Sequence, residues 1–264
     1  MSEPTETTSH RPRRIAVLAS GGGSNLQALI DYFAGAGASA GTICWVGSDK
    51  AQAGAFDRAQ AAGIPTAHVT APHDGDVLLA LLREARADLL VLAGYLKLIP
   101  EVVVRAFHGR LVNIHPALLP AFGGPGMYGQ RIHAAVLAHG AMVTGATVHF
   151  VDEQFDRGPI IAQWPVPVLP GDTPALLASR VLAVEHRLFP LCVAAVAAGT
   201  VQLGEDGRVH GDLGIPVPVH SPAWRFALTA DDTPDPTPIS HPTPDGTSAA
   251  AHAFATDVAR LFPR

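Results

Sequence analysis

The chain has 264 residues, of which 48% are hydrophobic and 16% are charged, and its formal net charge is −5. This composition excludes wholesale disorder and leaves room for one large α/β domain with an appendage. The mild negative charge gives no support to a nucleic-acid partner, whose phosphates require a basic face.

The chain begins with a polar segment and a glycine-rich loop. Residues 1–13 lack the apolar run of a secretion signal and are predicted to form a disordered leader. Residues 14–19 then form an apolar strand, residues 20–25 read Ser-Gly-Gly-Gly-Ser-Asn, and helical spacing begins at Leu26. Because Leu26 replaces the third glycine of a dinucleotide fingerprint, the loop does not indicate a nicotinamide site. Its position at a helix start favours phosphate binding, with a tight structural turn as the alternative.

Strands alternate with helices along the next part of the chain. The apolar patterns predict strands at residues 41–46, 66–69 and 88–94, separated by helices at 52–62 and 77–87. Farther on they predict a helix at 131–139, strands at 145–151 and 160–168, and a long helix at 174–198. We therefore expect an α/β fold with a doubly wound, mostly parallel sheet, an added antiparallel strand and a long C-terminal helix. In such folds, ligands gather at the carboxyl ends of the strands.

The composition changes near residue 216. Residues 216–264 are Pro-rich and are predicted to form a C-terminal extension, within which residues 249–262 have an amphipathic pattern. No segment offers ~18 uninterrupted apolar residues, so we expect no membrane span and a cytoplasmic location. Cys44 and Cys192 lie in apolar sequence without metal or redox spacing and are predicted to be buried free thiols.

Asn113 and His115 stand two residues apart at the end of an apolar segment, just before Pro116. In an extended strand they project from the same side, and the proline turns the chain into a loop. An amide can hold a developing oxyanion and an imidazole can move a proton, while a carboxylate from elsewhere can orient the imidazole. The pair favours acyl-type transfer, although a lone Asn-x-His is more often a loop histidine with satisfied hydrogen bonds.

Further segments accompany this pair. Residues 20–26 read Ser-Gly-Gly-Gly-Ser-Asn-Leu, residues 93–97 read Ala-Gly-Tyr-Leu-Lys, and residues 144–151 read Thr-Gly-Ala-Thr-Val-His-Phe-Val. With Asn-Ile-His-Pro-Ala-Leu-Leu-Pro at 113–120, Asp-x-Gly-Pro-Ile at 156–160 and Glu-His at 185–186, they resemble the glycinamide ribonucleotide formyltransferases of purine biosynthesis. The resemblance runs from about residue 14 to residue 203 and implies a formyltransferase domain, which we place at residues 14–215.

The resemblance implies a role for each matching residue. It implies catalytic roles for Asn113, His115 and Asp156. It implies phosphate and ribose binding at Gly23, Ser24, Asn25 and Glu185, and folate binding at Leu96, Lys97, Leu98, Ile99 and His149. The co-substrate would be 10-formyltetrahydrofolate and no metal is implied. We expect small-molecule substrates, no nucleic-acid or membrane partner, and a monomer or homodimer.

The chain departs from the family pattern at two places. Residues 121–130 are longer than the form many members carry and resemble a Gly-Met-Tyr-Gly subgroup, which leaves the substrate contacts of this loop open. Residues 73–76, His-Asp-Gly-Asp, lack an arginine associated with ligand contact in some relatives. Outside the motifs, we interpret His133 and His139 as surface histidines and Lys97 as a charge at the rim of the pocket.

The mechanism implied by the resemblance is attack of the acceptor amine on the formyl carbon. Asn113 and a cationic His115 would hold the tetrahedral oxyanion, and Asp156 would raise the pKa of the histidine and relay the proton to the folate nitrogen. Binding both substrates together makes the encounter effectively unimolecular.

Three alternatives remain. Hydrolysis of 10-formyltetrahydrofolate would use the same side chains with water, but the related hydrolases carry an amino-terminal domain that residues 1–14 are too short to supply. Formylation of initiator methionyl-tRNA is disfavoured because residues 220–264 contain three arginines and no lysine. A non-catalytic phosphometabolite-binding module has no need of an oxyanion donor beside an imidazole.

Overall fold

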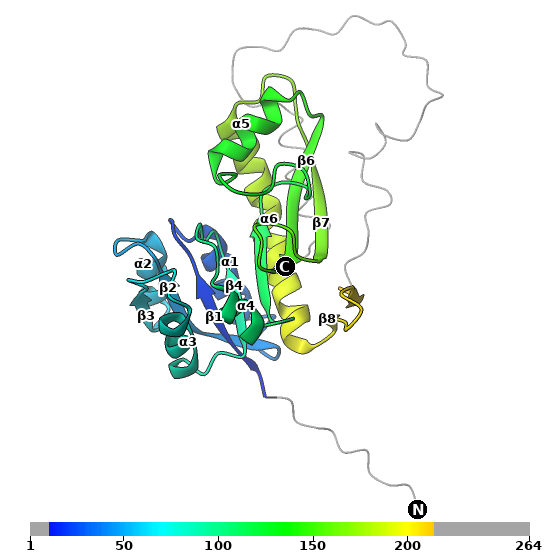
Figure 1. The fold of residues 1–264 in the computed structure, drawn as a ribbon. Coiled ribbons are helices and arrows are strands. Elements are labelled where there is room, and N and C mark those ends of the chain that lie inside the picture. The colour runs from blue at the N-terminus through cyan, green and yellow to red at the C-terminus, as the bar shows by residue number, and fades with distance from the viewer. Residues whose placement is uncertain (1–10, 214–264) are drawn as a thin grey trace, which may run out of the picture.

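The computed structural model describes residues 11–213 (Figure 1). The predicted C-terminal extension at 216–264, its amphipathic stretch and residues 1–10 of the predicted leader lie outside the described residues. Residues 11–13 do not belong to a leader, because β1 begins at Arg13 and the guanidinium of Arg11 pairs with the Asp88 carboxylate at 2.9 and 3.0 Å.

Seven strands form one sheet in the order β3-β2-β1-β4-β5-β6-β7. The parallel part contains β1 (Arg13–Leu18), β2 (Gly41–Ser48), β3 (Thr66–His68), β4 (Leu89–Leu92) and β5 (Leu111–His115). The antiparallel part adds β6 (Val143–Phe150) against β5 and β7 (Ile160–Pro167) against β6. The predicted doubly wound sheet is confirmed, and its antiparallel addition comprises two strands.

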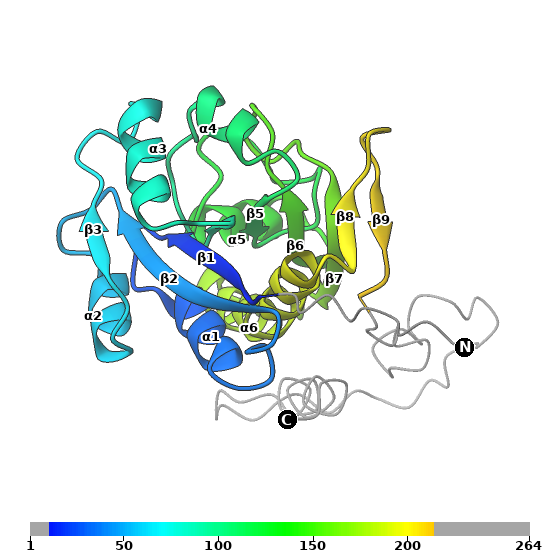
Figure 2. The ribbon, with the colours of Figure 1, turned by 90° about the horizontal axis from the view of Figure 1, so that it is seen from below.

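Helices cover both faces of this sheet (Figure 2). One face is covered by α1 (Ser24–Phe33), α2 (Gly54–Ala61), α5 (Gln130–Ala138) and α6 (Pro174–Ala198), whose apolar side chains share one core cluster. The other is covered by α3 (Gly75–Glu84) and α4 (Glu101–Ala106), which belong to a second cluster. The four residues of β4 are all buried, as expected for a strand covered on both faces.

The long helix α6 has the bounds predicted from its periodicity. Thr173 caps its N-terminus by accepting a hydrogen bond from the Leu176 amide, Pro174 occupies the first helical position, and Gly199 ends the helix in a left-handed conformation. Among the described residues it is the one helix long and apolar enough to span a membrane, and much of it is buried in the core. After α6 comes a small hairpin of β8 (Val201–Leu203) and β9 (Val209–Gly211), which the sequence patterns did not predict.

Candidate active site

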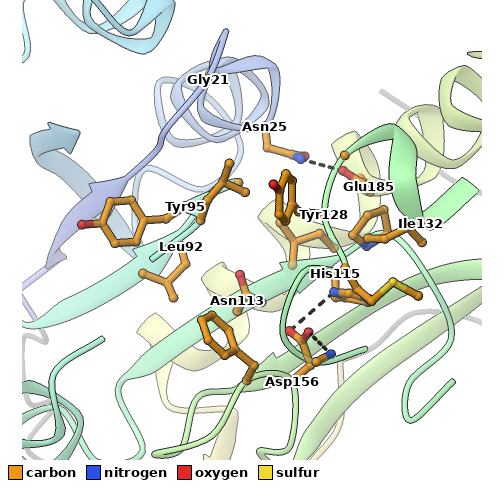
Figure 3. A pocket seen from close by; sticks show the side chains of 18 of the residues that line it. Gly21, Asn25, Leu92, Tyr95, Asn113, His115, Tyr128, Ile132, Asp156 and Glu185 are labelled. Atoms are coloured by element: carbon orange, nitrogen blue, oxygen red, sulfur yellow. Dashed lines mark hydrogen bonds and ion pairs between the residues drawn. The ribbon is translucent and has the colours of Figure 1, made fainter. Parts of the chain in front are cut away.

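A cavity of about 650 Å³ lies over β4 and β5 and reaches the start of α1 (Figure 3). Its size falls within the range of small-molecule sites. Ten of the twelve predicted site residues border it: Asn25, Leu96, Lys97, Leu98, Ile99, Asn113, His115, His149, Asp156 and Glu185. Gly23 and Ser24 do not, and Gly21 is the loop glycine that borders the cavity.

Asn113 and His149 face the cavity from neighbouring strands. They are directly opposite in the antiparallel pairing of β5 and β6, so their side chains share one face of the sheet. His149 Nδ1 lies 2.7 Å from the carbonyl of Phe150, which requires the proton on Nδ1. In the neutral ring, Nε2 is therefore an acceptor, and the Asn113 amide donates to it at 3.1 Å. This bond fixes the orientation of the Asn113 amide.

His115 is 4% exposed and is held between two acceptors. Its Nε2 donates to the carbonyl of Phe122 at 2.9 Å, and its Nδ1 lies 3.5 Å from Asp156 Oδ1. The loop that follows β5 is fixed from β6, because the Thr147 hydroxyl donates to the Ala117 carbonyl and accepts from the Leu119 amide. The imidazole thus has a defined tautomer and one nitrogen directed at a carboxylate.

Asp156 comes from the connection between β6 and β7 and has a left-handed φ of 56°. The backbone amide of Gly124 donates to its Oδ2 at 2.8 Å, while Oδ1 lies 3.5 Å from His115 Nδ1 and 3.8 Å from His149 Nε2. The side chain is 10% exposed. The convergence of this carboxylate with the imidazole, expected from the motif at 156–160, is present in the fold.

The pKa of His115 is lowered and not raised as the sequence analysis expected. Asp156 was expected to raise this pKa and keep the ring cationic. In the structure, burial lowers the pKa of His115 more than the Asp156 carboxylate and the Phe122 carbonyl raise it. Burial also lowers the pKa of His149, so the site favours two neutral imidazoles beside one carboxylate.

The glycine loop supplies the N-terminus of α1. Gly23 precedes the first helical residue with φ +73°, and the N–H groups of the first helical turn have no partner within the helix. A Cβ at Gly23 would lie 2.8 Å from Ala55 Cα, so glycine is required both by backbone conformation and by close packing. Arg58 of α2 donates from Nε to the carbonyl of Gly22 and holds the loop.

Glu185 meets the same end of the cavity from α6. The Asn25 amide donates to its Oε2 at 2.6 Å (Figure 3), and the residue is 6% exposed. Burial raises the pKa of Glu185 to about 7, and the Asn25 bond opposes this rise. Asn25 Oδ1 is buried and accepts no hydrogen bond within the described chain. Polar groups able to bind hydroxyls therefore adjoin the helix N-terminus.

The opposite end of the cavity is apolar. Leu92 and Ile99 are buried there, whereas Leu96 and Leu98 are 45% and 39% exposed. Exposed leucines beside a cavity are typical of a surface that an apolar ligand covers. Lys97 borders the cavity and is half-buried, in agreement with a charge at its rim.

Two residues of the site were missed or misread. His133 was interpreted as a surface histidine, but it is 4% exposed, borders the cavity and has no partner for Nδ1 among the described residues. Its neighbour Ile132 and the residue one turn on, Val136, are both buried, and this apolar face of α5 was the available signal. Tyr128 also borders the cavity, and the Arg131 guanidinium lies 4.9 Å from the centre of its ring.

The arrangement brings a carboxylate, two neutral imidazoles and an oriented amide to one cavity, between an anion-binding helix end and an apolar wall. Such a set can bind a phosphorylated acceptor and a flat apolar donor and move a proton between them. Within residues 11–213, no group of three or more His, Cys, Asp or Glu side chains could hold a metal ion.

The fold and the site define the chain as a member of the formyl transferase family, whose model matches residues 13–193. Within that family, it is similar to phosphoribosylglycinamide formyltransferases and to a trifunctional purine biosynthetic protein. It is 44% identical over 209 residues to the chloroplastic phosphoribosylglycinamide formyltransferase of Arabidopsis thaliana, covering 76% of this chain and 71% of the relative. It is also 44% identical over 203 residues to the human trifunctional purine biosynthetic protein adenosine-3, where the match covers 74% of this chain but 19% of that protein.

Solved structures agree with this assignment. Glycinamide ribonucleotide transformylase 1 from Symbiobacterium toebii matches with a TM-score of 0.70 and 39% identity, over 80% of this chain and 100% of that chain. A formyltetrahydrofolate deformylase from Pseudomonas syringae matches with a TM-score of 0.68 at 25% identity, over 77% of this chain and 67% of that chain. Transferases and a hydrolase therefore share the architecture seen here.

Proposed function

We propose that this chain is a phosphoribosylglycinamide formyltransferase of purine biosynthesis. It transfers the formyl group of 10-formyltetrahydrofolate to the amine of phosphoribosylglycinamide. The observation that carries the proposal is the convergence of Asn113, His115 and Asp156 on a cavity that has a helix N-terminus at one end and an apolar wall at the other.

The two ends of the cavity suit the two substrates. The acceptor phosphate would bind at the open N–H groups of the first turn of α1, and its ribose hydroxyls at Asn25 and Glu185. The pteridine of the donor would lie against the wall formed by residues 96–99, with Leu92 and Val151 beneath it. The formyl carbon would then lie between the substrates, near Asn113 and His115.

The reaction forms a C–N bond from the acceptor amine to the formyl carbon and breaks the bond from that carbon to the folate nitrogen. The Asn113 amide has a second N–H beyond the one that His149 accepts, and this donor would hold the tetrahedral oxyanion. The amine loses one proton and the folate nitrogen gains one. Asp156 and His115 would carry this proton, because Asp156 Oδ1 lies 3.5 Å from His115 Nδ1, whose lone pair in the neutral ring can take up a proton from the carboxyl group.

The neutral ground state of His115 changes its expected part in the reaction. A ring whose pKa is lowered by burial becomes cationic only when it takes up the proton released by the amine, and Asp156 then stabilises that charge. The imidazole would therefore act first as an acceptor of the proton and afterwards as a donor to the leaving nitrogen.

Similarity to a deformylase makes hydrolysis the second candidate. The test incubates the full chain with 10-formyltetrahydrofolate, with and without phosphoribosylglycinamide, and follows folate absorbance. Conversion that depends on the amine supports the transferase. Conversion without the amine supports the hydrolase, and no conversion in either arm contradicts both.

The proposal includes a cellular location and an oligomeric state. We propose a cytoplasmic enzyme that acts as a monomer or homodimer on small molecules, with no resident metal and no nucleic-acid or membrane partner. Sedimentation of the full chain at micromolar concentration would establish its oligomeric state.

A further inference from the structure

A buried carboxylate outside the cavity connects its two ends. Asp49 follows β2, and its side chain is 1% exposed. The Ser20 hydroxyl donates to Asp49 Oδ1 at 2.6 Å and at the same time accepts from the backbone amide of Leu96 at 3.1 Å. One hydroxyl thus links the end of β2, the start of the glycine loop and the segment that lines the apolar wall.

The backbone reinforces this connection. The amide of Ser20 donates to the carbonyl of Gly94, and the amide of Ala19 donates to the carbonyl of Gly47. Ser20 directly precedes Gly21, which borders the cavity, and Leu96 borders it on the other side. A change in the Ser20 hydroxyl bond would therefore alter the relative placement of both loops.

The carboxylate is costly for a purely structural role. Its second oxygen accepts no hydrogen bond within the described chain, and the nearest cation, Lys50 Nζ, is 3.6 Å away on a side chain that is 59% exposed. Taking a carboxylate out of water carries a large penalty unless it is fully paired. The Tyr95 hydroxyl is buried and has no hydrogen-bond partner within residues 11–213, and burial together with the charge of Asp49 raises its pKa. Incomplete pairing at such a position is typical of a functional constraint.

We propose that Asp49 is a positioning residue for formyl transfer. Through the Ser20 hydroxyl, it holds the amide of Leu96 and so sets the donor-binding segment 95–99 against the acceptor-binding glycine loop. The inference rests on the proposed function for the identity of the donor and the acceptor. Asp49 contacts neither substrate in this arrangement, because it does not border the cavity.

The position of the bond predicts which kinetic constant changes. Removing the acceptor for the Ser20 hydroxyl lets that hydroxyl rotate and weakens its bond to the Leu96 amide, whose segment binds the donor, while the N–H groups at the start of α1 remain in place. Asp49→Ala is expected to raise the KM for 10-formyltetrahydrofolate about tenfold, which is the effect of about 1.4 kcal/mol in binding. The KM for phosphoribosylglycinamide is expected to change less than threefold.

The test compares four variants of the full chain with the wild type in the amine-dependent assay. Asp49→Asn keeps an oxygen that accepts from Ser20 and should restore the donor KM to within threefold of wild type. Ser20→Ala removes the bridging hydroxyl and should reproduce the defect, which keeps the test valid if Asp49→Ala does not fold. Asp57→Ala removes an exposed acid from α2 and serves as the matched control.

The outcomes separate this inference from the proposed function. An inactive wild type would refute the proposed function. The positioning role could then be tested alone, by fluorescence titration of a folate analogue into the wild type and Ser20→Ala. The variant is expected to bind the analogue about tenfold more weakly. An active wild type with unchanged donor KM in Asp49→Ala and Ser20→Ala would overturn the positioning role. A lowered melting temperature with both KM values unchanged would do the same, and so would an Asp49→Asn variant as impaired as Asp49→Ala.

Discussion

The backbone groups and the side chains that face the cavity come mainly from different parts of the sheet. Over the parallel strands β1 and β4, the chain offers mainly backbone: the glycine loop and the segment at 95–99. Over the antiparallel pair β5 and β6, it offers side chains: Asn113, His115 and His149, joined by Asp156 from the next connection. Binding groups and titratable groups are therefore separated along the sheet.

Strand direction explains this division. A parallel strand ends in a loop that begins a helix, and the cavity meets backbone groups there. Antiparallel neighbours place side chains directly opposite one another, so β6 brings His149 to Asn113 without a loop. Gly158 allows the return toward β7, because a Cβ there would overlap the carbonyl oxygen of Phe150, and this return carries Asp156 to His115.

The comparison predicts that changes to the side chains over β5 and β6 reduce turnover, while changes to the backbone groups over β1 and β4 reduce stability and binding. The largest effect is expected for Asp156→Asn. This variant keeps an acceptor for the Gly124 amide but loses the charge that stabilises a protonated His115, so kcat should fall about 10³-fold, within the range for acid–base groups. Asp152→Asn, on the same connection, is the matched control. Turnover of Asp156→Asn within threefold of wild type would contradict the relay.

Asn113→Ala should have the next largest effect. Loss of one oxyanion donor is expected to lower kcat about 10²-fold with little change in either KM. His149→Ala leaves the amide in place but removes the acceptor that orients it, so its effect should be smaller, about tenfold. Steady-state kinetics on both variants measures the two losses of kcat. A larger loss in His149→Ala than in Asn113→Ala would contradict the assignment of Asn113 as the oxyanion donor and His149 as the residue that orients it.

Much of the fold follows from sequence patterns alone. The alternation of apolar strands and helices predicts the parallel sheet, and Pro174 with Gly199 marks the ends of α6. The helix α4 has six residues, too few for a periodicity to be recognised, and the strands of the β8–β9 hairpin have three residues each. Such short elements are stabilised mainly by packing against the rest of the protein, and the local sequence does not contain enough information to predict that packing.

The site was predictable to the extent that its residues lie in motifs. The spacing of Asn113 and His115 predicts a shared face, and the structure has them on the same cavity. The lowered pKa of His115 and the burial of His133 were not predictable, because both depend on how many atoms from other elements surround the ring. The contact between Ser20 and Asp49 joins two loops 29 residues apart, neither of which indicates the other.

Gly23→Ala tests the backbone conformation at the start of α1. An alanine would have to keep φ near +73° and would place Cβ 2.8 Å from Ala55 Cα, which should lower the free energy of unfolding by about 2 kcal/mol. Gly22→Ala is the matched control, since a Cβ there has no atom within 4 Å. Urea denaturation measures both. Equal midpoints for the two variants would show that the left-handed cap is not required.

Glu185 lies at the glycine-loop end of the cavity, because α6 places it against Asn25 of α1. With its pKa raised to about 7, the carboxyl is about one-tenth ionised at pH 6 and about nine-tenths ionised at pH 8. Ribose hydroxyls donate better to a carboxylate than to a carboxylic acid. Acceptor affinity should therefore increase as pH rises through 7, by up to about tenfold between pH 6 and pH 8 if only the ionised form binds.

The variant Glu185→Gln tests whether the ionisation of Glu185, and not that of another group in the site, causes the pH dependence. The amide resembles the protonated carboxyl at every pH, so the KM of the variant for phosphoribosylglycinamide should lie closer to the wild-type value at pH 6 than at pH 8. The donor KM should follow the same pH profile in both proteins, because the donor-binding segment 95–99 lies at the other end of the cavity from Glu185. A wild-type acceptor KM that stays constant from pH 6 to pH 8 would mean that the ionisation of Glu185 does not contribute to acceptor binding.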